Sequence, residues 1–230
     1  MTTITPRVAI VTGASRGLGL ALTRSLSDQG WRVVVDARNG EELRRAAGRL
    51  SGVTCIPGDV CDSEHRVALL EAAGCRIDLV VNNAGTLGPS PRPDLADFPA
   101  DELRSLFEVN VLAPLALVQL ALPRLPAGAA VVSVTSDAAR EPYAGWGGYG
   151  SAKAALEQLT TILAAEHPSL RIYSFDPGDM RTVMHQQAFP GEDISDRPLP
   201  EESVPALLEL VSGELPSGRY SAAELTPASV

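Results

Sequence analysis

Short apolar segments rich in β-branched residues recur along the chain, and segments with helical periodicity separate them. Continuous apolar runs of this length are typical of strands whose two faces are both covered. Six of these segments are expected to be strands, namely Val8–Val11, Arg32–Val35, Val53–Ile56, Ile77–Val81, Val131–Val134 and Arg171–Phe175. Residues 216–221 are the candidate for a seventh strand.

The intervening segments carry apolar residues three or four positions apart, which places them on one face of a helix. These stripes are Leu18/Leu22/Leu26, Val67/Leu70 and Ala152/Leu156/Leu159/Leu163. The alternation of strand and helix predicts one doubly wound, Rossmann-type α/β domain over residues 1–230, with a mainly parallel sheet of about seven strands flanked by helices. Ligands of such sheets bind beyond the carboxyl ends of the strands, so functional residues are sought in those loops.

Composition and charge narrow the choice of partner. The 230 residues are 45% apolar and 20% charged, as in an ordinary globular protein. The net charge of −9 disfavours nucleic acid or an anionic membrane as the main partner. The most apolar stretch, Val111–Leu122, contains Pro114 and Gln119 and is shorter than a membrane span. We therefore expect neither nucleic acid nor membrane as a partner.

Cysteine and histidine usage gives no sign of a metal site. Cys55, Cys61 and Cys75 are odd in number and form no CxxC motif, so neither a disulfide framework nor a zinc site is indicated. The histidines are scattered, at positions His65, His167 and His185. We expect surface or capping roles for them, no metal ligation and no metal hydrolase activity. Too few apolar residues follow the polar N-terminal segment for a signal-peptide core, so a cytoplasmic location is expected.

Three glycines mark the junction between the first strand and the first helix. Gly13, Gly17 and Gly19 lie within Thr12–Gly19, with the spacing GxxxGxG. Glycines at such a junction let the backbone turn tightly and approach a pyrophosphate, which then lies at the positive N-terminus of the helix. By itself the motif is also compatible with a plain tight connection, and its position between strand and helix favours the dinucleotide.

Several motifs in the same order along the chain resemble the short-chain dehydrogenases/reductases. They are the glycine loop, Asp59–Val60, the Asn82–Gly85 sequence NNAG, the Tyr149–Lys153 pattern YxxxK and Pro177–Thr182. The resemblance extends from Val8 to about Thr182. It implies cofactor contacts from Gly13, Ser15, Arg16, Gly17, Leu18, Gly19, Arg38, Asp59, Val60, Asn83, Ala84, Gly85, Tyr149, Lys153, Pro177, Gly178 and Thr182.

The residues after the second strand bear on the choice of nicotinamide cofactor. NAD enzymes usually present a carboxylate to the ribose 2′-hydroxyl, whereas NADP enzymes present Arg or Lys to the 2′-phosphate. Alignment on the second strand puts Ala37 at the NAD-selecting position, and Arg38 and Arg16 at phosphate-binding positions. This favours NADP(H). NAD(H) stays open, because Asp36 would face the ribose if the strand ended one residue differently.

Four polar residues are candidates for catalysis. Tyr149 and Lys153 are four residues apart and share a helix face, and a nearby cation lowers the pKa of a phenol from about 10. By resemblance, Ser136, thirteen residues before Tyr149, is the catalytic serine at a strand end. Asn110 matches the asparagine that anchors a water to the lysine. Alternatively, Asn110 lies at a helix kink caused by Pro114.

The resemblance implies hydride transfer between NADP(H) and a carbonyl or secondary alcohol, with Tyr149 as acid and base. The protein is then expected to be a ketone or aldehyde reductase. Two alternatives stay open: an NAD-dependent alcohol dehydrogenase of the same family, and a nucleotide-sensing protein without turnover. The implied partners are a small carbonyl or alcohol substrate and a second copy of the chain, in a homodimer or homotetramer.

Three segments are expected to shape the substrate pocket: Gly85–Arg92, Asp137–Trp146 and Met184–Phe189. The region 184–200 shows no clear periodicity and contains Phe189-Pro190-Gly191. Long irregular connections of this kind often act as lids over active sites, so a substrate lid is expected there.

Overall fold

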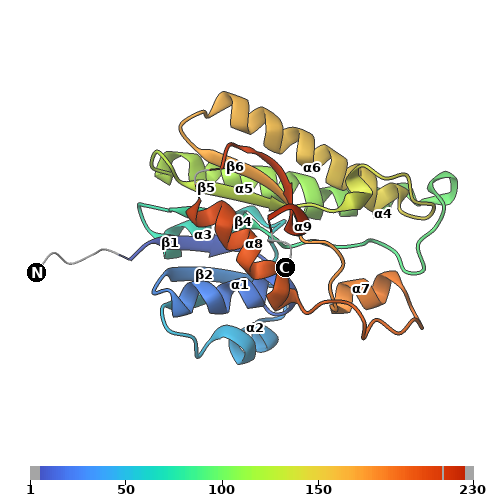
Figure 1. The fold of residues 1–230 in the computed structure, drawn as a ribbon, viewed down its shortest axis with the longest axis horizontal. Coiled ribbons are helices and arrows are strands. Elements are labelled where there is room, and N and C mark those ends of the chain that lie inside the picture. The colour runs from blue at the N-terminus through green and yellow to red at the C-terminus, as the bar shows by residue number, and fades with distance from the viewer. Residues whose placement is uncertain (1–5, 214, 226–230) are drawn as a thin grey trace, which may run out of the picture.

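Seven strands form one sheet in the computed structural model, which describes residues 6–213 and 215–225 (Figure 1). They are β1 Val8–Val11, β2 Arg32–Ala37, β3 Val53–Pro57, β4 Leu79–Asn82, β5 Ala130–Val134, β6 Arg171–Asp176 and β7 Gly218–Ser221. The strand order is β3-β2-β1-β4-β5-β6-β7, and every neighbouring pair is parallel. The predicted doubly wound sheet is confirmed, including its seventh strand. The order reverses between β1 and β4, where such sheets bind ligands.

Helices cover both faces of the sheet. The α-helices are α1 Gly17–Asp28, α2 Gly40–Ala47, α3 Ser63–Ala73, α4 Ala100–Phe107, α5 Ala113–Ala121, α6 Gly147–Glu166, α7 Val183–Ala188, α8 Pro200–Ser212 and α9 Ala222–Leu225. Shorter helical turns are η1 Leu95–Asp97, η2 Glu108–Leu112, η3 Leu122–Arg124 and η4 Asp137–Ala139. Figure 1 shows α1, α2 and α8 on one side of the sheet and α5 and α6 on the other.

Side chains of alternate strand residues point to opposite faces of the sheet and pack into two separate hydrophobic cores. Val11 of β1 packs towards α1, α2 and α8, whereas Ile10 packs towards α3 and α5. The stripe predicted on α1 is buried as expected. The stripe predicted on α3 is wrong at Val67, which is 42% exposed, because α3 turns Leu69 and Leu70 to the core instead.

The helical segments α4, η2, α5 and η3 follow one another without a break over residues 100–124. This run of 25 residues contains an 18-residue window with a mean hydropathy of 1.7, so it is long and apolar enough to cross a membrane by those two criteria. The sequence predicts a shorter apolar stretch here, Val111–Leu122, interrupted by Pro114 and Gln119. Pro114 lies in the first turn of α5, where proline is tolerated. Leu117 and Val118 of this run pack in the core with α3.

Candidate active site

Tyr149 and Lys153 lie in the first two turns of α6, and both are buried. The Lys153 ammonium donates a hydrogen bond of 2.7 Å to the carbonyl oxygen of Val134, the last residue of β5. Its nitrogen lies 5.5 Å from the centroid of the Tyr149 ring. The predicted shared helix face is confirmed, and it lies at the carboxyl end of the sheet.

The pKa of the Tyr149 phenol is raised in this structure, mainly by burial and further by the carboxylates of Asp176 and Asp137. The expectation that Lys153 lowers it is wrong here, because loss of hydration of the phenolate outweighs an ammonium at this distance. Burial also lowers the pKa of Lys153 from 10.5 to about 8. Tyr149 is therefore a neutral phenol at neutral pH, and thus a proton donor.

The lowered pKa of Lys153 predicts that Lys153→Met is more stable than the parent protein at pH 7. The buried ammonium disfavours the folded state at every pH below about 8, and methionine removes this cost. The cost falls as pH rises from about 8 to 10.5, because only the folded protein then loses the proton. Calorimetry should show a gain of about 1 to 3 kcal/mol at pH 7 and a smaller one at pH 9.5. A loss of stability at pH 7 would contradict this.

Ser136 follows β5 and begins the short turn η4, as expected for a residue at a strand end. Its hydroxyl donates to the Asp137 carboxylate at 2.9 Å and accepts from the Ala138 amide at 3.2 Å. A side chain at Gly150 would collide with the carbonyl oxygen of Ala138, so glycine there lets η4 pack directly on α6. No local sequence pattern reveals this role of Gly150, which brings the Ser136 turn against the helix that carries Tyr149.

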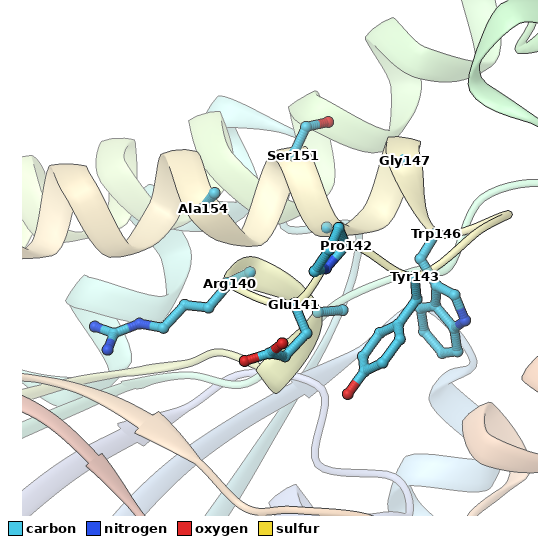
Figure 2. A pocket seen from close by; sticks show the side chains of 11 residues that line it. Arg140, Glu141, Pro142, Tyr143, Trp146, Gly147, Ser151 and Ala154 are labelled. Carbon is cyan, nitrogen blue, oxygen red and sulfur yellow. The ribbon is translucent and has the colours of Figure 1, made fainter.

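A pocket of about 220 Å³ opens beside this turn (Figure 2). It lies between residues of segment 138–147 and the face of α6 that carries Ser151 and Ala154. Tyr143 in its wall donates from its hydroxyl to Asp137 at 3.0 Å. Of the three segments expected to shape a substrate pocket, the one around 137–146 lines this pocket.

The other two expected segments pack around Tyr149 itself. Its apolar cluster includes Leu87, Ala138 and Ala188, with Trp146, Met184 and Phe189 packed against it. The rings of Trp146 and Tyr149 meet edge to face, with centroids 5.8 Å apart. The guanidinium of Arg92 stacks 4.0 Å from the Trp146 ring and donates to the carbonyl oxygen of Ala188. Segments 87–92 and 184–189 are thus held together beside Tyr149.

The region expected as an irregular lid begins with a helix, α7. The hydroxyl of Thr182 accepts from the His185 amide at 3.1 Å and caps this helix. A side chain at Gly17 would lie 3.6 Å from the Thr182 methyl group, so the start of α7 adjoins the glycine loop. The expectation of an irregular segment over 184–200 is therefore wrong at residues 184–188, which belong to α7. An N-cap threonine was the missed signal.

Asn110 lies in η2, which is π-helical, and is fully buried. Its amide accepts from the Thr86 N–H at 3.0 Å and donates to the Thr86 carbonyl oxygen at 2.8 Å. A side chain at Gly85 would lie 3.0 Å from the Asn110 oxygen and 3.8 Å from the Lys153 nitrogen. The predicted partnering of a buried asparagine is confirmed. The helix irregularity is the π-helical turn at Asn110 itself, where such turns often mark functional sites.

The glycine loop is locked to the segment after β4. The Asn83 side-chain amide donates to the carbonyl oxygens of Thr12 at 2.8 Å and Gly13 at 3.1 Å. A side chain at Gly13 would lie 2.8 Å from the Ala84 Cα, and its φ of +68° also favours glycine. The side chain of Arg16 does not cap α1, whose first turn carries no acidic residue. Among the described residues, no side chain therefore caps the N-terminus of α1, which is the kind of helix start that binds a pyrophosphate.

Asp36 is buried beneath this loop rather than at its rim. Its carboxylate accepts from the Gly13 N–H at 2.7 Å and contacts His65 Nε2 at 3.1 Å. β2 runs through Asp36 to Ala37, so the carboxylate points inward and Arg38 follows at the exposed end. The expected surface or capping role of His65 is wrong: its ring is buried and pairs with Asp36. The two residues are far apart in sequence, so no local pattern reveals the pair.

Two further predicted segments lie at the same edge of the sheet. The Asp59 carboxylate accepts from the Cys61 N–H at 2.9 Å, and Val60 beside it is buried. Gly178, with φ of +71°, donates from its N–H to Asp176 at 3.0 Å. The carbonyl oxygen of Pro177 accepts from Ser203 of α8 at 3.0 Å.

The predicted site residues differ in exposure. Arg16, Arg38, Asp59 and Gly178 are exposed. Half-buried residues are Gly13, Ser15, Gly17, Asn83, Ala84, Gly85, Ser136 and Thr182. The buried ones are Leu18, Gly19, Val60, Asn110, Tyr149, Lys153 and Pro177.

Comparisons with known proteins agree with this geometry. The sequence model of the short chain dehydrogenase family matches residues 7–193. An oxidoreductase named YciK from Escherichia coli K12 is 31% identical over 222 residues, covering 90% of this chain and 87% of its own. Sepiapterin reductase of Bos taurus is 32% identical over 204 residues, covering 79% of this chain and 75% of its own.

A crystal structure of a short chain dehydrogenase from Escherichia coli CFT073, complexed with NADPH, superimposes with a TM-score of 0.85 at 29% identity. It covers 95% of this chain and 97% of its own. The fold, the ordered motifs and these relatives together show that the chain belongs to the short-chain dehydrogenase family and is an NAD(P)-dependent oxidoreductase.

Proposed function

We propose that the protein is an NADP(H)-dependent reductase of carbonyl compounds, with Tyr149 as the acid that protonates the product alkoxide. The observation that carries the proposal is the buried pair on α6: a neutral phenol and an ammonium at the carboxyl end of β5. A phenol that keeps its proton suits the reducing direction, in which the enzyme must donate one.

The residues of the glycine loop suit the pyrophosphate, because the loop leads into the N-terminus of α1, which no side chain of the described residues caps. Gly85, Pro177, Gly178 and Thr182 lie at the same edge of the sheet and would hold the nicotinamide half. When bound, the nicotinamide supplies or accepts the hydride. The protein's own contribution is to orient this ring and the substrate and to exclude water.

The polar groups around Tyr149 take distinct roles in the proposal. Ser136, on the turn packed against α6, donates a hydrogen bond to the substrate oxygen together with Tyr149. Lys153 holds the cofactor ribose and places a positive charge near the phenolate formed when Tyr149 gives up its proton. Asn110 keeps Thr86 and Gly85 in place and anchors a water that returns the proton to Lys153.

The environment of the second strand supports NADP(H) over NAD(H). Asp36 is occupied by Gly13 and His65, and so is not available to a ribose hydroxyl. Arg16 and Arg38, which follows Ala37, are both exposed and would bind the 2′-phosphate. The related structure from Escherichia coli CFT073 contains NADPH.

We expect Arg38→Ala and Arg16→Ala each to weaken NADPH binding by about tenfold and to leave NADH binding unchanged, because only NADPH carries the 2′-phosphate. Fluorescence titration with both cofactors measures this. Arg49→Ala, another exposed arginine in the sequence after α2, is the matched control and should change neither affinity. Equal losses for both cofactors in the Arg38 variant would contradict the assignment.

The cluster of Leu87, Trp146, Met184 and Phe189 around Tyr149 supports a carbonyl substrate with an apolar body, and α7 with the following segment is the proposed lid. A cytoplasmic dimer, formed through the exposed side chains of Leu112 and Leu120, is part of the proposal. A screen of ketones and aldehydes for NADPH consumption tests the function directly. NADPH binding without turnover of any carbonyl would favour a nucleotide sensor instead.

A further inference from the structure

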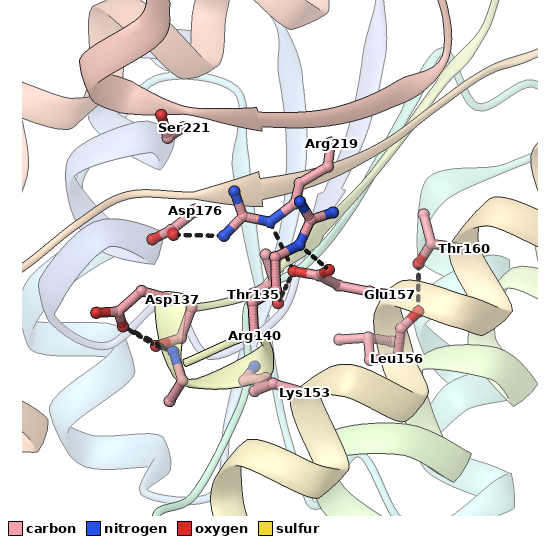
Figure 3. A network of polar contacts seen from close by, with 12 residues as sticks. Thr135, Asp137, Arg140, Lys153, Leu156, Glu157, Thr160, Asp176, Arg219 and Ser221 are labelled. Carbon is pink, nitrogen blue, oxygen red and sulfur yellow. Dashed lines mark hydrogen bonds and ion pairs between the residues drawn. The ribbon is translucent and has the colours of Figure 1, made fainter. Parts of the chain in front are cut away.

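A group of charged side chains joins strand ends that carry different parts of the site (Figure 3). Arg219 of β7 donates to Asp176 of β6 at 2.7 Å and to Glu157 of α6 at 2.8 Å. Glu157 also accepts from Thr135 at 2.9 Å and from Arg140 at 3.1 Å. Arg219 therefore connects β6 with the helix that bears Tyr149 and Lys153.

Each end of this charged group adjoins a segment of the proposed active site. Asp176 accepts from the N–H of Gly178 and so fixes the turn expected to back the nicotinamide. Thr135 precedes Ser136, so Glu157 holds the base of the serine turn. Glu157 is one helical turn beyond Lys153 on the same face of α6.

The carboxylates of this group depend on their cations. Asp176 is 7% exposed and Glu157 9% exposed, whereas the Arg219 guanidinium is half-buried between them. Buried carboxylates are stable as ions only with a paired cation and full hydrogen bonding. Arg219 is the cation that pairs with Asp176 among the described residues, while Glu157 has Arg140 as a second partner.

We propose that Arg219 is a positioning residue of the active site, which fixes the Gly178 turn and neutralises the Asp176 carboxylate. The proposal rests on the proposed function. The charge of Asp176 acts on the phenol directly, since this carboxylate raises the pKa of Tyr149. Without Arg219 the same charge would act uncompensated, and formation of the phenolate would become harder.

Other charged groups also face Tyr149 or the elements packed against it. They are Lys153 on α6, Asp137 and Arg140 at η4, Asp176 on β6, His185 on α7 and Arg92 in the segment after β4. None of these is changed in Arg219→Gln. A shift in the pH profile of that variant therefore reports the loss of compensation at Asp176 and Glu157.

The test compares Arg219→Gln, Asp176→Asn and the double variant by the pH dependence of alcohol oxidation with NADP, in which Tyr149 acts as the base. Arg219→Gln should shift the profile to higher pH by about half to one unit, a three- to tenfold rate loss on its acid limb. Asp176→Asn should shift it to lower pH. The double variant should lose the upward shift, because the uncompensated charge is gone.

Thermal unfolding without cofactor gives a second readout. Arg219→Gln should unfold at lower temperature than the parent, and Asp176→Asn in the same chain should restore part of the loss. Arg171→Gln is the control, because Arg171 also bridges β6 to distant carbonyl groups but touches no carboxylate among its described contacts. It should lower stability and leave the pH profile unchanged.

The outcomes separate the two proposals. If the parent enzyme is active and Arg219→Gln has the same pH profile as the parent, the role of Arg219 is overturned. A similar shift of the pH profile in Arg171→Gln also overturns it. If Arg219→Gln does not fold, the pH profile of Asp176→Asn decides the question. An unshifted profile in that variant overturns the inference.

A parent protein that binds NADPH but turns over no carbonyl or alcohol contradicts the proposed function instead. The thermal comparison then decides on Arg219, and a double variant no more stable than Arg219→Gln overturns its pairing with Asp176.

Discussion

Tyr149→Phe is expected to reduce carbonyl turnover by at least a thousandfold while NADPH still binds with nearly unchanged affinity. The phenylalanine ring fills the same place in the cluster with Trp146 and Ala188 but has no proton to give to the alkoxide. General acid catalysis and the lost oxyanion hydrogen bond together account for an effect of about this size. NADPH consumption and a binding titration on the same preparation measure the two parts separately.

Tyr143→Phe is the matched control for this variant. Tyr143 is an exposed tyrosine near the same turn and donates its hydroxyl to Asp137. Because that phenol lies outside the cluster around Tyr149, its removal should change turnover by less than about tenfold. Normal turnover in Tyr149→Phe would remove Tyr149 from the reaction, whatever the control shows.

Gly13→Ala is expected to abolish measurable cofactor binding, a loss of at least a hundredfold in affinity. The added methyl group would lie 2.8 Å from the Ala84 Cα and 3.2 Å from the side-chain nitrogen of Asn83, so the glycine loop must move. Movement there also breaks the contact between the Gly13 N–H and Asp36. Isothermal titration with NADPH measures the effect.

Gly30→Ala separates this loss from backbone strain. Gly30 has φ of +78°, and a side chain there would meet no atom within 4 Å. Both variants therefore carry a similar conformational cost of about 1 kcal/mol, but only Gly13→Ala disturbs the loop. If both variants bind NADPH equally well, the glycine loop is not the pyrophosphate site.

The architecture was predictable because it follows from local patterns. Apolar runs such as Val8–Val11 are buried on both faces, and their alternation with helices restricts the topology to few choices. The pairing of Tyr149 with Lys153 was predictable for the same reason, since the two residues are neighbours on one helix. The seventh strand, Gly218–Ser221, was the weakest of these patterns and is confirmed by its pairing with β6.

Features that depend on distant residues were not predictable. Asp36 meets His65 and Gly13 through three separate elements, and Asp176 meets Arg219 across a strand pair. The direction of the pKa shift of Tyr149 was predicted wrongly for a related reason. Spacing along a helix reveals the nearby ammonium, whereas loss of hydration depends on how α7 and η4 close over the ring.

The central claim is that a nicotinamide dinucleotide binds on the glycine loop beside Tyr149. Isothermal titration of the purified protein with NADPH and with NADH tests it most directly. The account predicts saturable binding of NADPH at one site per chain, tighter than that of NADH. If neither NADPH nor NADH gives a heat of binding, in protein shown to be folded by its thermal transition, the claim is contradicted.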